Sequence, residues 1–261
     1  MLRGRVDSLD ELVAVVARLR GEGGCPWDRA QTFETLRPYV LEEAYEVVEA
    51  IDRGDPDAVR RELGDALFQI VLLARIAADR RSFTIDDVAR SAADKMIGRH
   101  PHVFDPSAER TEGAGGMAAW EGHKARERGE GTSALDGVPA ALPSLLRAHR
   151  VSEKAASVGF DWPDTAGVRA KVSEELAELD TAIASGDPRS IGEELGDLLF
   201  ALVNLGRHLP VAAEDALRMA TAKFESRFRR MEAHIQAGGG SVAATGAEAL
   251  DAAWGVSKEG G

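Results

Sequence analysis

The chain has 261 residues, of which 44% are hydrophobic, and carries a formal net charge of −12. This acidic balance argues against a nucleic-acid polymer as a partner, because a polyphosphate backbone requires a clustered basic surface. Cys25 is the single cysteine, so no disulfide can form within the chain, and a reducing compartment, the cytoplasm, is expected. No run approaches the ~20 apolar residues that span a bilayer, and the N-terminus lacks a secretion signal, so no membrane association is expected.

Apolar residues recur at helical spacing through the first half of the chain. The pattern predicts helices over residues 8–20, about 35–52, about 57–79 and 84–99. The tetrapeptide Arg53-Gly54-Asp55-Pro56 separates the second helix from the third, so these two helices are expected to form a hairpin. The third helix carries an apolar stripe that we expect to face a core, at Val59, Leu63, Leu67, Ile70, Val71 and Ala74.

The second half repeats this organisation. Residues 105–135 predict a connection with a short helix around Trp120. A second module then runs from about Leu142 to Lys258, and its hairpin turns at Ser185-Gly186-Asp187-Pro188. The sequence shows no long alternation of apolar and polar residues. We therefore expect an all-α protein of two helical-bundle modules, residues 1–135 and 136–261.

A gapless internal repeat relates the two hairpins. Residues 42–75 are identical to residues 174–207 at 17 of 34 positions, which indicates a duplicated module. The duplication preserves five acidic residues in each copy. In the first copy they are Glu42, Glu43, Glu46, Glu62 and Asp65, and in the second they are Glu174, Glu175, Glu178, Glu194 and Asp197.

The spacing of these acids predicts a metal site. Glu43 and Glu46 lie one turn apart on one helix, as Glu62 and Asp65 do on the next. If the helices pack antiparallel, the acids converge at the edge of a buried seam, where only a cation relieves their repulsion. Mg²⁺ selects hard oxygen ligands and keeps positions for water and phosphate. We expect Mg²⁺ at Glu43, Glu46, Glu62 and Asp65, and equally at Glu175, Glu178, Glu194 and Asp197.

The competing interpretation is an ordinary solvated acidic face, which is the common meaning of such spacings on a single helix. Retention of the same acid type at each position in both copies favours the metal. Gly64 and Gly196, each beside an acid, indicate either a close helix approach or room for a ligand, because glycine inside a helix costs about 1 kcal/mol relative to alanine.

A pair of basic residues one turn apart also occurs twice. Lys95 and Arg99 form the first pair, and Lys223 and Arg227 form the second. Opposite metal-bound carboxylates, such a pair would suit a polyphosphate. An exposed basic face is the alternative.

A tryptophan followed four residues later by lysine is also repeated. The two occurrences are Trp120 with Lys124, and Trp254 with Lys258. Stacking on a base, with the amine on a phosphate, is one interpretation. Packing in a core is the other, and the more common one.

With these motifs in place, the chain resembles the tandem members of the MazG nucleoside triphosphate pyrophosphohydrolases. The resemblance covers nearly the whole chain. In the first module it lies in G-C-P-W-D-R-A-Q-T at 24–32, Y-V-L-E-E-A-Y-E-V-V-E-A-I at 39–51 and R-E-L-G-D-A-L-F-Q at 61–69. In the second it lies in V-G-F-D-W at 158–162, E-E-L-G-D-L-L-F-A at 193–201 and K-F-E-S-R-F-R-R at 223–230.

The resemblance implies an all-α NTP pyrophosphatase fold, Mg²⁺ dependence, homodimerisation, and hydrolysis of NTPs or dNTPs to the monophosphate and pyrophosphate. It also implies a housekeeping role in clearing aberrant nucleotides. The C-terminal module would be catalytic, which places ligand roles on Glu175, Glu178, Glu194 and Asp197. Substrate-binding roles would fall on Lys223, Arg227, Trp254 and Lys258, although the chain ends in an unusually short tail after Lys258.

Glu174, adjacent to the ligands but facing elsewhere, is a candidate general base or outer ligand. Two alternatives to this enzyme remain open. One is a module that senses or binds Mg-nucleotide without hydrolysing it, and the other is a structural dimerisation bundle.

Overall fold

The computed structural model describes residues 8–105 and 133–258, and within these ranges it contains helices and turns but no strand. The all-α prediction is therefore confirmed. The chain divides into two compact units, residues 1–114 and 115–261; the module boundary after residue 135 stays a prediction. The short helix expected around Trp120 lies outside the described residues.

The first unit is built around a hairpin of α3 (Phe33–Arg53) and α4 (Pro56–Asp79). Thr32 and Thr35 form a reciprocal capping box at the start of α3, and Gly54 ends it in the left-handed conformation with φ +64°. Asp55 then caps α4, whose first residue is proline. These local signals explain why the predicted hairpin and its turn are confirmed.

Four further helices complete the described part of this unit. They are α1 (Ser8–Arg20), α2 (Pro26–Ala30), α5 (Ile85–Arg99) and α6 (Pro101–Phe104). Helix α1 packs against α4, and the buried core there consists of Val16, Leu36, Val71, Leu72 and Ile76.

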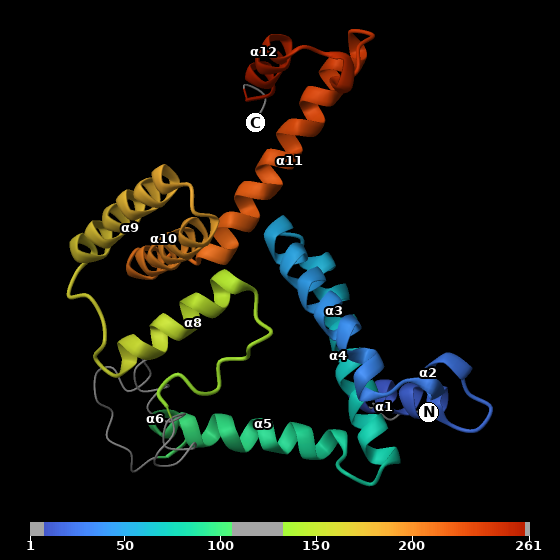
Figure 1. Cartoon of the computed structure of the whole chain (residues 1–261). Helices are drawn as coiled ribbons and strands as arrows, with labels where there is room; N and C mark the ends of the chain where they lie inside the picture. Colours follow the sequence, from blue (N-terminus) through green and yellow to red (C-terminus); the bar gives the residue numbers. More distant parts are fainter. Residues whose placement is uncertain (1–7, 106–132, 259–261) are drawn as a thin grey trace. The chain divides into compact units, whose positions relative to one another are not determined.

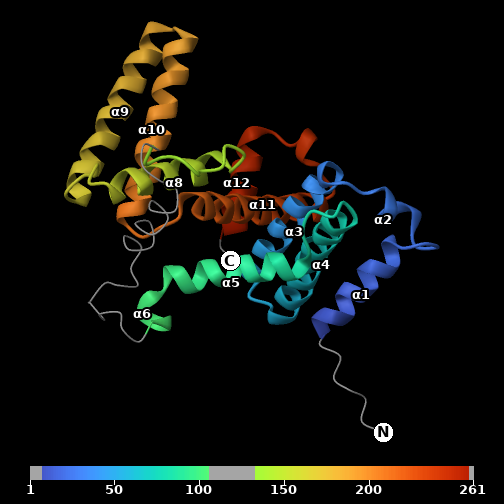
Figure 2. The same cartoon turned by 90° about the horizontal axis from the view of Figure 1, so that it is seen from below.

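The second unit repeats the hairpin with α9 (Thr165–Ser185) and α10 (Pro188–His208). Asp164 caps α9, Gly186 ends it with φ +72°, and Asp187 caps α10 ahead of its N-terminal proline. Helix α8 (Ser144–Ser157) packs against α10. Beyond the hairpin, α11 (Ala213–Ala237) packs with α12 (Ala247–Lys258), which follows the 3₁₀ turn Val242–Ala244. Figure 1 and Figure 2 show α9 and α10 side by side in both views.

The apolar stripe predicted for α4 is only partly buried by its own chain. Val71 and Ala74 are buried, but Leu63, Leu67 and Ile70 are 53%, 39% and 47% exposed. The prediction that the whole stripe faces a core within one chain was therefore wrong for Leu63, Leu67 and Ile70. Their counterparts in α10, Leu195, Leu199 and Leu202, are exposed as well.

Candidate active site

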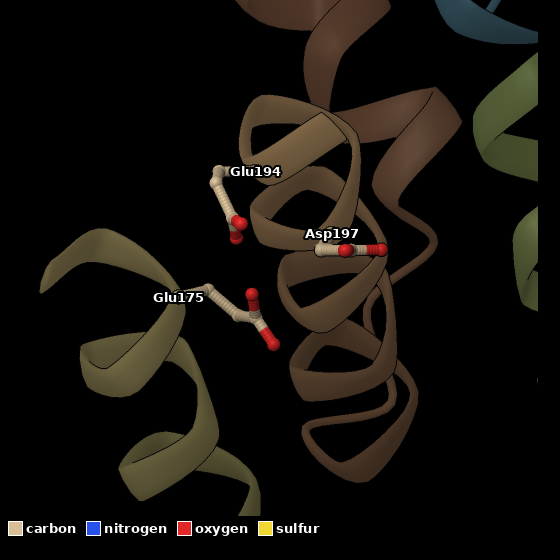
Figure 3. Close-up of side chains that lie close together, drawn as sticks. All are labelled: Glu175, Glu194 and Asp197. Carbon is tan, nitrogen blue, oxygen red and sulfur yellow. The ribbon is translucent and has the colours of Figure 1, made fainter. Parts of the chain in front are cut away.

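Three of the predicted metal ligands come together between α9 and α10. Glu175 projects from α9, and Glu194 and Asp197 lie one turn apart on α10 (Figure 3). One carboxylate oxygen from each lies within 4.8 Å of the others. Glu175 is buried, Glu194 is half-buried and Asp197 is exposed, so the group runs from the seam of the hairpin to solvent. A hard divalent cation fits this all-carboxylate donor set.

The charges of this group act on one another. Burial raises the pKa of Glu194, and the negative charges of Glu178, Glu175 and Asp197 raise it further. Glu178, the fourth predicted ligand, is therefore close enough to Glu194 to repel it, although its oxygens lie outside the tight group of three. Removing such repulsion is what a bound cation does.

Lys171 is a residue of this site that the sequence analysis missed. Its ammonium lies 2.7 Å from a carboxylate oxygen of Glu174 and 2.7 Å from one of Glu175. Hydrogen bonds to Glu174 and then Glu175 raise the pKa of Lys171. Its spacing of three and four residues from two acids was the available signal, but the repeat hid it because the first module has Tyr39 at the equivalent position.

The first module arranges its acids differently. Gln69 Nε2 donates a hydrogen bond to Glu43 Oε1 at 3.3 Å. Burial raises the pKa of Glu46, and the negative charges of Glu43 and Glu62 raise it further. These acids therefore also lie near one another across α3 and α4. Among the described residues, however, the tight group of three or more ligand atoms occurs only in the second module. Asp65 is exposed.

The two helix glycines are not required by close packing. A Cβ added at Gly64 or at Gly196 would meet nothing within 4 Å. Of the two interpretations offered for these glycines, close helix approach is wrong within the chain, and open space beside the acids is what the structure contains.

The predicted substrate-binding residues lie on α11 and α12. Lys223 is exposed and Arg227 half-buried, and no hydrogen bond or ion pair within the described residues joins either to the carboxylate group. Helix α11 extends away from the α9–α10 hairpin in Figure 1. Trp254, half-buried on α12, packs against Phe224 with ring centroids 5.2 Å apart. Lys258, the last described residue, is exposed.

The corresponding residues of the first module are less informative. Lys95 lines an open hollow of about 460 Å³ on α5, together with Phe83, Asp87 and Val88. Trp120 and Lys124 lie outside the described residues.

Together the fold and the site define an all-α protein with duplicated helical hairpins and a carboxylate group suited to a metal. The sequence profile of the MazG nucleotide pyrophosphohydrolase domain matches residues 31–104 and 165–231, one segment in each module. The chain belongs to this family of enzymes, and the resemblance seen in the sequence is confirmed.

Individual relatives agree with this assignment. The chain is 46% identical over 252 residues to the nucleoside triphosphate pyrophosphohydrolase/pyrophosphatase MazG of Thermotoga maritima, covering 96% of both chains. It is 44% identical over 255 residues to the nucleoside triphosphate pyrophosphohydrolase of Escherichia coli, covering 95% of this chain and 96% of the relative. A protein of the same name from Mycobacterium tuberculosis is 39% identical over 158 residues, 60% of this chain and 47% of the relative.

Proposed function

We propose that this protein hydrolyses nucleoside and deoxynucleoside triphosphates to the monophosphate and pyrophosphate, with Mg²⁺ as cofactor. The observation that carries the proposal is the convergence of Glu175, Glu194 and Asp197 in the C-terminal module of a MazG family member. The names of its relatives support the reaction. Removal of aberrant nucleotides in the cytoplasm is the proposed biological role. In the part of the chain that the structure describes, no helix has the length and apolar character of a membrane span.

The residues of the second module would divide the work. Glu175, Glu178, Glu194 and Asp197 would hold the cation, and Glu43, Glu46, Glu62 and Asp65 would hold another in the first module. When bound, a divalent cation lowers the pKa of a water ligand and neutralises phosphate charge. Glu174, whose carboxylate is exposed and forms an ion pair with Lys171, is the proposed general base or outer ligand.

Binding of the triphosphate is assigned to the cations of α11 and α12. Lys223 and Arg227 would neutralise the phosphates as the bond between the α and β phosphates breaks. Trp254 and Lys258 would contact the nucleoside end. Because α11 extends away from the α9–α10 hairpin in Figure 1, we propose that the substrate spans from the hairpin to α11 or that a second copy brings its own α11 to the site.

We further propose that the protein is a homodimer. The α9–α10 hairpin has an apolar face that is not covered by any other part of the chain among residues 8–105 and 133–258. It is formed by Leu176, Ile183, Leu195, Leu199, Phe200 and Leu202. A face of this kind on a two-helix hairpin is typical of an interface. A second copy of the same hairpin offers a matching apolar surface and would complete a four-helix bundle.

The test is pyrophosphate release from a panel of ordinary and damaged triphosphates, with Mg²⁺ and identification of both products. Glu194→Gln is expected to lower turnover by roughly a hundredfold or more, in line with the loss of a metal ligand. Glu193→Gln is the matched control, because Glu193 is the adjacent exposed acid and pairs with Arg189. Full activity in Glu194→Gln would contradict the assignment. Tight Mg-nucleotide binding without product release would favour the sensor.

A further inference from the structure

The two modules differ at a position that faces the same acid. Gln69 of α4 corresponds to Ala201 of α10 in the gapless repeat. In the first module the amide of Gln69 reaches Glu43, with Nε2 donating to Oε1 at 3.3 Å. In the second module Ala201 cannot make such a contact with Glu175, the counterpart of Glu43.

Gln69 is a buried side chain with one polar atom left unsatisfied. The residue is only 7% exposed. Its Oε1 is buried and has no hydrogen-bond partner within residues 8–105 and 133–258. A buried amide oxygen in that condition costs free energy until a donor or a cation meets it. The atom therefore indicates a ligand.

The position of Gln69 on the helix places it with the acids. Glu62, Asp65 and Gln69 follow one another at intervals of three and four residues, so they form one stripe on α4. Across the hairpin, Glu46 lies close enough to Glu43 and Glu62 for their charges to act on it. The amide of Gln69, with its unsatisfied oxygen, therefore lies at one end of the acidic residues that face one another across α3 and α4.

We propose that Gln69 is a ligand of a divalent cation in the N-terminal module, adding its amide oxygen to Glu43, Glu46, Glu62 and Asp65. A half-turn about the last side-chain bond exchanges the amide oxygen and nitrogen, so that the hydrogen bond from Nε2 to Glu43 gives way to a cation shared by the amide oxygen and the carboxylate. Carbonyl oxygens are hard ligands that Mg²⁺ and Mn²⁺ accept. The inference rests on the metal sites of the proposed function and distinguishes one from the other.

The two sites then have different tasks. In the second module the ammonium of Lys171 competes with a cation for Glu175, and Ala201 supplies no ligand, so more coordination positions stay with water and phosphate. In the first module Tyr39 replaces Lys171, and Gln69 adds an oxygen. The N-terminal site holds its cation without nucleotide, whereas the C-terminal site takes its cation together with the triphosphate.

The experiment is a titration of the full chain with Mn²⁺ in the absence of nucleotide, following free Mn²⁺ by electron paramagnetic resonance. One site per chain is expected to be tight, and to persist in Glu194→Gln. Gln69→Met removes the oxygen at nearly constant volume and should weaken that site by roughly tenfold or more. Gln69→Glu restores an oxygen and should retain it. Equal Mn²⁺ affinity in the wild type, Gln69→Met and Gln69→Glu would overturn the proposal. The absence of a tight site in the wild type would also overturn it.

Thermal melting separates this role from a purely structural one. If Gln69 only braced Glu43, Gln69→Met would lower the metal-free melting temperature and leave the Mn²⁺-induced rise unchanged. Methionine removes the hydrogen bond from Nε2 to Glu43 in either case, so the metal-free melting temperature should fall for both roles, but only the loss of a ligand shrinks the Mn²⁺-induced rise. Pyrophosphate release is measured separately, so failure of the proposed hydrolysis would not be mistaken for failure of this inference.

Discussion

Lys171 Nζ lies 2.7 Å from a carboxylate oxygen of Glu175, one turn further along α9. Glu175 is buried, and a buried carboxylate without a counter-charge is strongly unfavourable. The ammonium of Lys171 therefore neutralises Glu175 in the way that a bound metal cation would. Before metal binds, this ion pair is what makes the burial of Glu175 tolerable.

The first prediction follows from this pair. Lys171→Met should lower the melting temperature measured in a chelator, because Glu175 loses its counter-charge. The rise in melting temperature on adding Mg²⁺ should become larger than in the wild type, because the lysine no longer competes with the ion. Lys171→Arg, which keeps the charge, is the control. Identical melting curves for Lys171→Met and the wild type in chelator would contradict the role given to the pair.

Much of the hairpin architecture was predictable because its signals are local. Gly54 and Gly186 adopt the left-handed conformation that ends a helix, and the Asp-Pro pairs that follow begin the next. Each of these signals occurs in both copies of the repeat, which strengthens the prediction of a hairpin in each. The convergence of Glu175 with Glu194 required only that the two helices pack antiparallel.

The residues that escaped prediction are those in which the two copies differ. Lys171 and Gln69 have no equivalent in the other module, where Tyr39 and Ala201 take their places, so the repeat does not identify either residue. Burial of Leu67 was predicted wrongly for a different reason. Helical periodicity shows that a face is apolar, but it does not show whether the same chain covers it.

The second prediction concerns the exposed apolar face of the α9–α10 hairpin. Leu199→Glu should convert a dimer into a monomer of 27.9 kDa, because a carboxylate placed in an apolar interface costs roughly 2 kcal/mol or more. Light scattering after size-exclusion chromatography measures the mass. Leu135→Glu is the control, since Leu135 is 44% exposed but lies outside the hairpin. An unchanged dimer in Leu199→Glu would remove this face from the proposed interface.

The third prediction uses an ion pair at the base of the same hairpin. Arg207 forms a two-pronged contact with Asp161, in which Nη1 donates to Oδ2 at 2.8 Å, and His208 Nε2 lies 3.0 Å from Oδ1. The hydrogen bonds from Arg207, and then from His208, outweigh burial and lower the pKa of Asp161 from 3.8 to about 2. The pair links the segment before α9 to the end of α10.

A lowered carboxyl pKa stabilises the fold above the unfolded-state value and stops doing so as the pH falls through the folded-state value. Asp161→Asn should therefore lower the free energy of unfolding by about 1–2 kcal/mol at neutral pH, allowing for partial exposure. The difference from the wild type should shrink between about pH 4 and pH 2. Urea unfolding at several pH values measures it. A difference that is as large near pH 2 as at pH 7 would contradict the linkage.

The fourth prediction separates packing from substrate contact at Trp254. Its ring lies 5.2 Å from that of Phe224, measured between centroids, so α12 is held to α11 partly through this pair. Trp254→Ala should lower stability by roughly 1–2 kcal/mol, less than for a fully buried tryptophan. Trp254→Phe keeps an aromatic face against Phe224 and should lose little stability.

Kinetics of the same two variants test the contact with substrate. If Trp254 stacks on the base, Trp254→Ala should raise KM for every triphosphate by roughly fivefold to a hundredfold, corresponding to 1–3 kcal/mol of lost stacking. Trp254→Phe should raise it much less, because a phenyl ring can also stack. A stability loss in Trp254→Ala with unchanged KM would leave only the packing role, and the nucleoside end of the substrate would then have to be bound by another part of the protein.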